Sequence, residues 1–138
     1  CINISYAEGF GLGTLEAMQC GTPIVAMKTG GLTRQVVDHR DGTENGVAIP
    51  VETRTLVGSQ SVPYIYEDYC SAQSLADALW KLYCLSYDEK QKLRKKVYEY
   101  ARSEFSLNKT VSDWHDTMLD TVKNWRDRRN QWSFEVVK

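Results

Sequence analysis

The sequence has no apolar run of the ~18 residues that a membrane-spanning helix requires, which argues against a membrane span. It also has little net charge, with 17 basic and 18 acidic residues, so nucleic-acid binding through bulk electrostatics is disfavoured. Its four cysteines form no C-x-x-C pair and its two histidines are isolated, which argues against a metal site. We interpret the cysteines as reduced thiols of a cytoplasmic protein.

A glycine-rich turn, EGFGLGTLE, occupies residues 8–16 but lacks features that common phosphate-binding motifs require. No Gly-Lys-[Ser/Thr] follows it, which excludes the phosphate loop of ATPases. The third glycine of the dinucleotide fingerprint G-x-G-x-x-G would stand at position 14, which is Thr14. The apolar run that follows ends in Met27-Lys28 instead of an acidic residue, so a nucleotide-dependent oxidoreductase is disfavoured as well.

The first fifty residues alternate between strand and helix patterns. We expect strands over residues 2–5, 24–27 and 47–49, helices over 12–20 and 32–38, and turns at 8–11 and 29–31. Gly21 and Pro23 stand where the first helix should be capped and stopped. The wholly apolar run 24–27 suits a strand buried on both faces of a parallel sheet. This alternation predicts an α/β fold, a Rossmann-like parallel sheet flanked by helices.

Beyond residue 50 the pattern changes. Residues 62–66 predict an edge strand or an ordered loop, and from residue 71 onward apolar residues at helical spacing predict a helical C-terminal part. Three apolar stripes are expected to be packing faces: Leu75, Leu79, Leu82 and Tyr83; then Leu93, Val97, Tyr100 and Ala101; then Val111, Trp114, Met118, Val122 and Trp125. Trp132 and Phe134 continue the third stripe, which we expect to pack against a further part of the protein.

Two carboxylates flank the glycine turn, and their positions suggest a ligand. Unpaired backbone N–H groups at a helix start attract phosphate, whereas Glu8 and Glu16 would repel it. Carboxylates accept hydrogen bonds from the vicinal hydroxyls of sugars. A nucleotide sugar satisfies all three elements, with its diphosphate on the amides and its two sugar rings on the two glutamates. The simpler alternatives are that Glu8 favours the positive end of the helix and that Glu16 is a surface residue.

The stretch EGFGLGTLEAMQCGTPIVAMKTGG resembles the donor-binding signature of retaining glycosyltransferases of family 4, which have the GT-B fold. The family pattern is matched by Glu8, Glu16, Ala17-Met18, Gly21, Pro23 and Gly30-Gly31. The match is specific over residues 1 to about 50 and holds only in general shape beyond them. It implies that residues 1–138 are the C-terminal, nucleotide-sugar-binding domain, one half of a GT-B glycosyltransferase.

The resemblance also implies roles for individual residues in retaining transfer of a hexose. Glu8 would be the catalytic residue and contact the transferred sugar, and Glu16 would bind the ribose. Contacts to the donor sugar and the diphosphate would come from Gly9, Phe10, Gly11, Leu12, Gly13 and Thr14. Catalysis would consist of stabilising the departing nucleoside diphosphate, with no metal and no further cofactor. The implied donors are GDP-mannose or UDP-glucose, of which we favour GDP-mannose. Lys28 and Arg34 are further candidates for phosphate contacts, although we expect both to be solvated.

The chain begins at Cys1 within an apolar run, which is typical of the middle of a protein. The resemblance implies an N-terminal domain that binds a still unknown acceptor, and a basic pair upstream of the motif. We therefore expect a fragment that transfers little or nothing without that domain. A non-catalytic sugar-nucleotide-binding or interaction module of the same fold stays open as an alternative, because both glutamates would serve binding as well as transfer.

Overall fold

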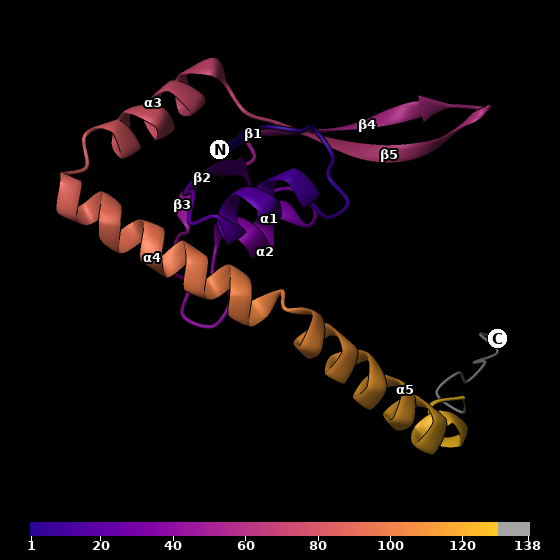
Figure 1. The fold of residues 1–138 in the computed structure, drawn as a ribbon. Helices are drawn as coiled ribbons and strands as arrows, with labels where there is room; N and C mark the ends of the chain where they lie inside the picture. Colours follow the sequence, from indigo (N-terminus) through magenta and orange to yellow (C-terminus); the bar gives the residue numbers. More distant parts are fainter. Residues whose placement is uncertain (130–138) are drawn as a thin grey trace. The chain divides into compact units, whose positions relative to one another are not determined.

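The computed structural model describes residues 1–129, which fall into two compact units divided between residues 102 and 103. The first unit contains the α/β part of the chain (Figure 1). No helix among the described residues is both long enough and apolar enough to cross a membrane.

A three-stranded parallel sheet forms the centre of the first unit. Its strands are β1 (Ile2–Asn3), β2 (Ile24–Met27) and β3 (Gly46–Ile49), in the spatial order β1-β2-β3. Every residue of β2 is buried, as expected of a central parallel strand. The predicted strands are confirmed, except that β1 ends at Asn3 and not at residue 5.

Two helices connect these strands and confirm the predicted α/β alternation. Helix α1 (Leu12–Gln19) lies between β1 and β2, and α2 (Leu32–Val36) lies between β2 and β3; both pack on β2. After α1 the chain turns at Gly21, where φ is 72°. The amides of Gly21 and Thr22 there donate to the last turn of the helix, in the pattern of a Schellman cap. Helix α2 is shorter than the predicted range 32–38.

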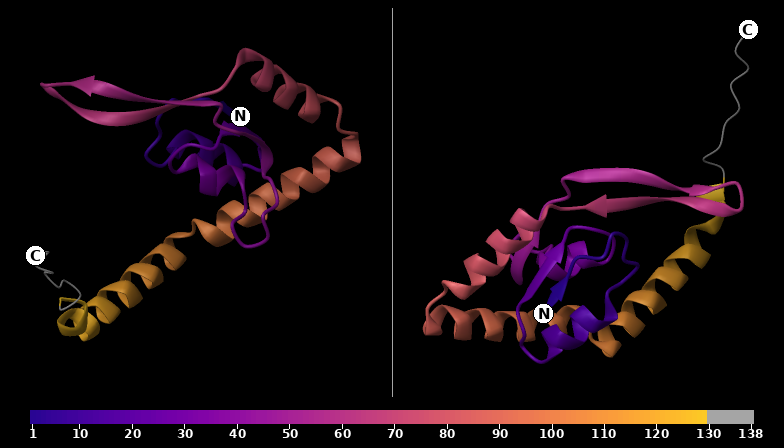
Figure 2. Two further views of the ribbon diagram at one scale, coloured as in Figure 1. Left: turned by 180° about the vertical axis from the view of Figure 1, so that it is seen from behind. Right: turned by 90° about the horizontal axis from the view of Figure 1, so that it is seen from above.

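An antiparallel hairpin follows β3 and forms a sheet of its own. Strand β4 (Thr53–Ser59) pairs with β5 (Val62–Tyr69), and Figures 1 and 2 show the hairpin extending away from the parallel sheet. The prediction for residues 62–66 is confirmed in its strand form, but β4 is absent from the sequence prediction. Residues of β4 are almost all exposed, so the apolar pattern that identifies a buried strand is missing.

Two helices complete the first unit. In α4 (Tyr87–Glu104) the predicted stripe is confirmed, with Val97, Tyr100 and Ala101 buried. In α3 (Ala72–Tyr83) the predicted stripe is wrong in part, because Leu79 and Tyr83 are exposed while Leu75 and Leu82 are partly buried. Helix α3 contacts the sheet mainly along edge strand β3, and Ala78 is its one described residue that is fully buried there.

The second unit consists of α5 (Leu107–Arg129) in the described part of the chain. Its predicted stripe is exposed in full, at Val111, Trp114, Met118, Val122 and Trp125. The expectation that this surface packs against a further part of the protein stays a prediction. Trp132 and Phe134 lie outside the described residues.

Candidate functional site

The glycine turn positions the start of α1. Gly11 has φ 87°, a left-handed conformation that other residues adopt only with strain. A Cβ at Gly11 would lie 2.7 Å from Leu32 and 3.2 Å from Gln35, so the glycine is also required for packing. The first helical hydrogen bond runs from the Leu15 amide to the Gly11 carbonyl, at 3.0 Å. The amides of residues 12–14 precede that bond, so they have no acceptor within the helix.

A second glycine pair lets the turn approach the loop between β2 and α2. A Cβ at Gly30 would lie 1.8 Å from the Glu8 carbonyl oxygen, and a Cβ at Gly31 would lie 2.6 Å from the Gly9 carbonyl oxygen. The Gly31 amide donates to that Glu8 carbonyl, at 3.2 Å. Backbone therefore lies directly on backbone here, and this contact fixes where Glu8 begins to project.

The side chain of Gln35 holds the same turn from below. Gln35 is fully buried on α2, and its Nε2 donates to the Phe10 carbonyl oxygen at 2.6 Å. Its Oε1 is buried and has no hydrogen-bond partner among the described residues. A buried amide oxygen without a hydrogen-bond partner destabilises the fold. The hydrogen bond from Nε2 to Phe10 offsets part of this cost and fixes the position of the turn.

A pocket of about 450 Å³ opens beside this turn. It lies where β1 and β2 end, at the edge of the sheet where open parallel sheets bind ligands. Three segments line it: Ala7, Glu8 and Gly9 after β1, Thr29 and Gly30 after β2, and Arg54, Tyr66 and Asp68 from the hairpin. Glu8, partly exposed, and Arg54, which is exposed, thus contribute opposite charges to one cavity.

Asp68 fastens the hairpin to this pocket. It is only 4% exposed, and its amide donates to the Tyr6 carbonyl oxygen in the loop after β1, at 2.7 Å. Its carboxylate accepts two hydrogen bonds from Arg54, at 2.6 and 3.0 Å. These bonds hold the pKa of the Asp68 carboxyl below its ordinary value, and a further bond from Thr29 lowers it in the same direction.

Only part of the predicted site lies in the lining of this pocket. Glu8 and Gly9 are in it, whereas Phe10, Gly11, Leu12, Gly13, Thr14 and Glu16 are outside it. Leu12 and Glu16 are exposed one turn apart on α1, so Glu16 lies on the same side of the helix as its first residue. The Thr14 side chain is buried, and its hydroxyl accepts from Asn3 at 3.2 Å, which leaves only its amide for a ligand.

Arg54, Tyr66 and Asp68 are pocket residues that the sequence analysis missed. The signal was present, because two runs of β-forming residues flank the turn-forming stretch Gly-Ser-Gln-Ser at 58–61. Pairing of the hairpin places Arg54 directly opposite Asp68.

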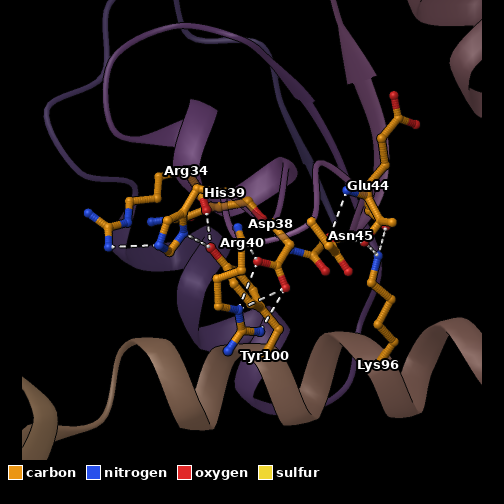
Figure 3. A network of polar contacts seen from close by, with 11 residues as sticks. Arg34, Asp38, His39, Arg40, Glu44, Asn45, Lys96 and Tyr100 are labelled. Atoms are coloured by element: carbon orange, nitrogen blue, oxygen red, sulfur yellow. Dashed lines mark hydrogen bonds and ion pairs between the residues drawn. The ribbon is translucent and has the colours of Figure 1, made fainter.

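The two further phosphate candidates differ in their position. Lys28 is exposed and follows β2 on the pocket side of the sheet. Arg34 is also exposed, but its terminal nitrogen Nη2 lies 3.4 Å from His39 Nε2. Both residues belong to a polar network around the loop that leads into β3 (Figure 3). That loop leads to the amino end of β3, whereas the pocket lies at the carboxyl ends of the strands. The structure therefore gives no support to a phosphate contact by Arg34.

The network in Figure 3 attaches this loop to α4. The Tyr100 hydroxyl donates to the Arg34 carbonyl oxygen at 2.6 Å, and the Arg40 guanidinium lies 4.8 Å from the centre of the Tyr100 ring. Arg40 also donates to Asp38 at 2.7 Å and holds the pKa of that carboxyl below its ordinary value. These contacts stabilise the fold on the side away from the pocket.

A second cavity, of about 470 Å³, lies near the amino ends of the strands, against Cys1, Pro23 and residues of α3 and α4. Its lining contains no carboxylate, and its only charged side chains are Lys90 and Arg94, so it lacks an anionic acceptor such as Glu8. Among residues 1–129, no group of three His, Cys, Asp or Glu side chains is placed to hold a metal ion.

The segment that carries the glycine turn is similar to known proteins. Residues 1–56 match the family described as glycosyl transferases group 1. A D-inositol 3-phosphate glycosyltransferase of Arthrobacter sp. (strain FB24) is 58% identical over 38 residues, which are 28% of this chain and 9% of that protein. The protein of the same name from Kribbella flavida is 62% identical over 38 residues, again 28% and 9%.

The corresponding protein of Corynebacterium jeikeium is 51% identical over 45 residues, which are 33% of this chain and 10% of that protein. The matched stretch thus spans only about a tenth of the length of these relatives. The family match confirms the resemblance that the glycine turn and its two glutamates predict.

Proposed function

We propose that this chain, whose residues 1–56 match the family of group 1 glycosyl transferases, forms the donor-binding part of a glycosyltransferase. The observation that carries the proposal is the position of Glu8. It lines a pocket of about 450 Å³ at the carboxyl ends of two parallel strands, directly before the glycine turn that starts α1. The donor in this proposal is a nucleotide-diphosphate sugar.

Each element of the turn has a role in this proposal. Glu8 accepts hydrogen bonds from hydroxyls of the transferred sugar, and the amides of the turn bind the sugar and the diphosphate. The diphosphate lies at the start of α1, where unpaired amides and the helix dipole favour an anion. Glu16 accepts from the ribose hydroxyls. The contact residues between the two glutamates are Gly9, Phe10, Gly11, Leu12, Gly13 and Thr14.

Transfer then proceeds with retention, as the family resemblance implies. The bond between the anomeric carbon and the diphosphate oxygen breaks, and an acceptor hydroxyl oxygen bonds to that carbon on the same face. Negative charge develops on the departing nucleoside diphosphate, which takes the proton of the acceptor hydroxyl. Amides already oriented toward that charge stabilise it without reorganising, which lowers the barrier. The chain's own residues supply this stabilisation, so the proposal requires no metal and no further cofactor.

The partners in the reaction are proposals of the same kind. An N-terminal domain of the same protein supplies the acceptor site and the remaining basic contacts. D-inositol 3-phosphate, which appears in the names of the relatives, is the first acceptor to test. GDP-mannose is our first candidate as donor and UDP-glucose the second. We place the enzyme in the cytoplasm, since its four cysteines are all free thiols.

Donor turnover by the full-length protein tests this proposal. Release of nucleoside diphosphate is measured with GDP-mannose, UDP-glucose and UDP-N-acetylglucosamine, with and without the acceptor. We expect Glu8→Gln to lower the rate about 100-fold and Glu16→Ala to weaken donor binding about tenfold. Glu99→Ala, at an exposed carboxylate on α4, is the matched control and should change neither.

Two results would contradict the proposal. Donor binding without turnover in any combination would favour the non-catalytic binding module of the same fold. Unchanged binding and turnover in both glutamate variants would remove the site itself.

A further inference from the structure

We propose that the hairpin β4–β5 is a sugar-recognition wall, in which Arg54 and Tyr66 bind the transferred sugar from the side opposite Glu8. This inference rests on the proposed function, because it concerns the same pocket. It goes beyond the family match, which ends at residue 56 and so leaves all of β5 outside. Tyr66 and Asp68 are therefore pocket residues outside the matched segment, whereas Arg54 lies near its end.

The first argument is that Arg54 is held in place and still has donors to offer. Its Nε and one terminal nitrogen donate to Asp68, at 2.6 and 3.0 Å. A guanidinium has five N–H donors in a rigid fork, so this pair occupies only part of them. Arg54 is exposed and lines the pocket. Because Asp68 is buried and fixed to two loops of the site, the guanidinium beside it is oriented before any ligand arrives.

The second argument is chemical complementarity across the pocket. An ionised carboxylate such as Glu8 only accepts hydrogen bonds, and a guanidinium such as Arg54 only donates them. In the part of the chain that the structure describes, these two groups form no ion pair with each other. A sugar hydroxyl both donates and accepts, so a ring bearing several hydroxyls can satisfy the two groups at once.

The third argument is the ring of Tyr66. It lies 5.9 Å from the Arg54 guanidinium carbon and is 63% exposed at the pocket. An aromatic ring with an apolar face and a polar hydroxyl suits a pyranose, whose C–H groups gather on one face while its hydroxyls lie around the edge. Tyr66 would then pack on the sugar ring while Arg54 bonds to its edge.

A phosphate contact by Arg54 is the competing role, and the position of the pocket argues against it. The lining contains Glu8, Gly9 and Gly30 but none of residues 12–14, whose amides start α1. A diphosphate bound by those amides would therefore be held by residues outside the lining to which Arg54 belongs. Arg54 therefore contacts the part of the donor that Glu8 contacts, which is the sugar.

Calorimetric titration of the full-length protein separates these roles. Two ligand pairs are compared, GDP-mannose against GDP and UDP-glucose against UDP, so that each pair differs only in the sugar. In the pair that binds, we expect Arg54→Lys and Tyr66→Ala to weaken the nucleotide sugar about tenfold while the free nucleotide changes less than twofold. Tyr64→Ala is the matched control, because Tyr64 is equally exposed, at 63%, on the same strand but outside the pocket.

The outcomes are distinguishable. Equal weakening of sugar and free nucleotide would place Arg54 on the diphosphate and overturn the inference, as would unchanged binding in both variants. If the wild-type protein binds neither member of either pair and does not bind UDP-N-acetylglucosamine, the proposed function fails, and the inference fails with it. Thermal unfolding of each variant checks the fold, and Tyr66→Ala keeps the test valid even if Arg54→Lys unfolds, because it leaves both hydrogen bonds between Arg54 and Asp68 in place.

Discussion

Replacing Gly30 by alanine tests how the site is built. At Gly30 φ is 45°, and a Cβ would lie 1.8 Å from the Glu8 carbonyl oxygen. Real contacts of this kind are at least 3.0 Å, so the Glu8 backbone has to move away. Two effects destabilise the variant: alanine has to adopt a left-handed conformation, and a packed loop has to move.

Two other glycines separate these costs. Gly42 has φ 75° and no atom within 4 Å of its Cβ position. Gly42→Ala therefore loses stability only through the left-handed conformation, by about 1–2 kcal/mol. Gly31 has an ordinary helical φ of −63°, but its Cβ would lie 2.6 Å from the Gly9 carbonyl oxygen. Gly31→Ala therefore loses stability only through this steric contact, by about 1–3 kcal/mol. In Gly30→Ala the conformation and the contact both destabilise the fold, by about 2–5 kcal/mol in total.

Urea unfolding and donor titration of the full-length variants provide the measurement. Gly30→Ala should lose the most stability, and Gly42→Ala and Gly31→Ala should each lose less. Donor affinity should fall in the Gly30 and Gly31 variants, since both displace the backbone that carries Glu8, and stay unchanged in the Gly42 variant. If Gly30→Ala were no less stable than Gly42→Ala, the contact with Glu8 would not constrain the loop, and our account of how Glu8 is positioned would be wrong.

Three further predictions concern residues beneath the turn and in the rest of the first unit. Gln35→Leu removes the bond to Phe10 but also the unpaired Oε1, so we expect the free energy of unfolding to change by no more than about 1 kcal/mol. Donor affinity should fall, because the turn loses this bond. Urea unfolding and donor titration on one sample measure both quantities, and an unaltered affinity would contradict the prediction. Gly21→Ala should cost about 1–2 kcal/mol through its left-handed φ and leave donor affinity unchanged, because Gly21 caps α1 at its far end; a loss of affinity in titration would count against this. The pKa of Asp38 is lowered by its bonds from Arg40, so the stability that this pair supplies should be present above about pH 4 and be lost as the pH falls below it. Urea unfolding between pH 3 and 6 should therefore show a weaker pH dependence in Asp38→Asn, and an identical dependence would refute the assignment.

The Gly-Gly pair illustrates why a sequence motif and its structural cause differ. In the sequence, Gly30 and Gly31 are only a turn and part of a family pattern. In the structure they are the two positions where a side chain would collide with the backbone of the loop bearing Glu8. A Cβ at Gly9 or Gly13 would meet nothing within 4 Å, so packing does not require glycine there, and close approach of a ligand remains the proposed reason for both.

The sequence by itself determined the elements whose signals are local. The buried run of β2, the cap at Gly21 and the apolar stripe of α4 follow from the residues alone, because burial and capping impose their own spacing. The two glutamates around the glycine turn likewise identified the segment that the family match covers.

Only the tertiary structure decided which residues share the pocket. The turn-forming stretch at 58–61 indicates a hairpin, but β4 is exposed and lacks a hydrophobic pattern, so the register that sets Arg54 opposite Asp68 is not readable along the chain. The contact of Asp68 with the loop after β1 joins residues that lie far apart in sequence. Such contacts depend on how separate elements pack together, whereas spacing along the chain reports only on the element to which a residue belongs.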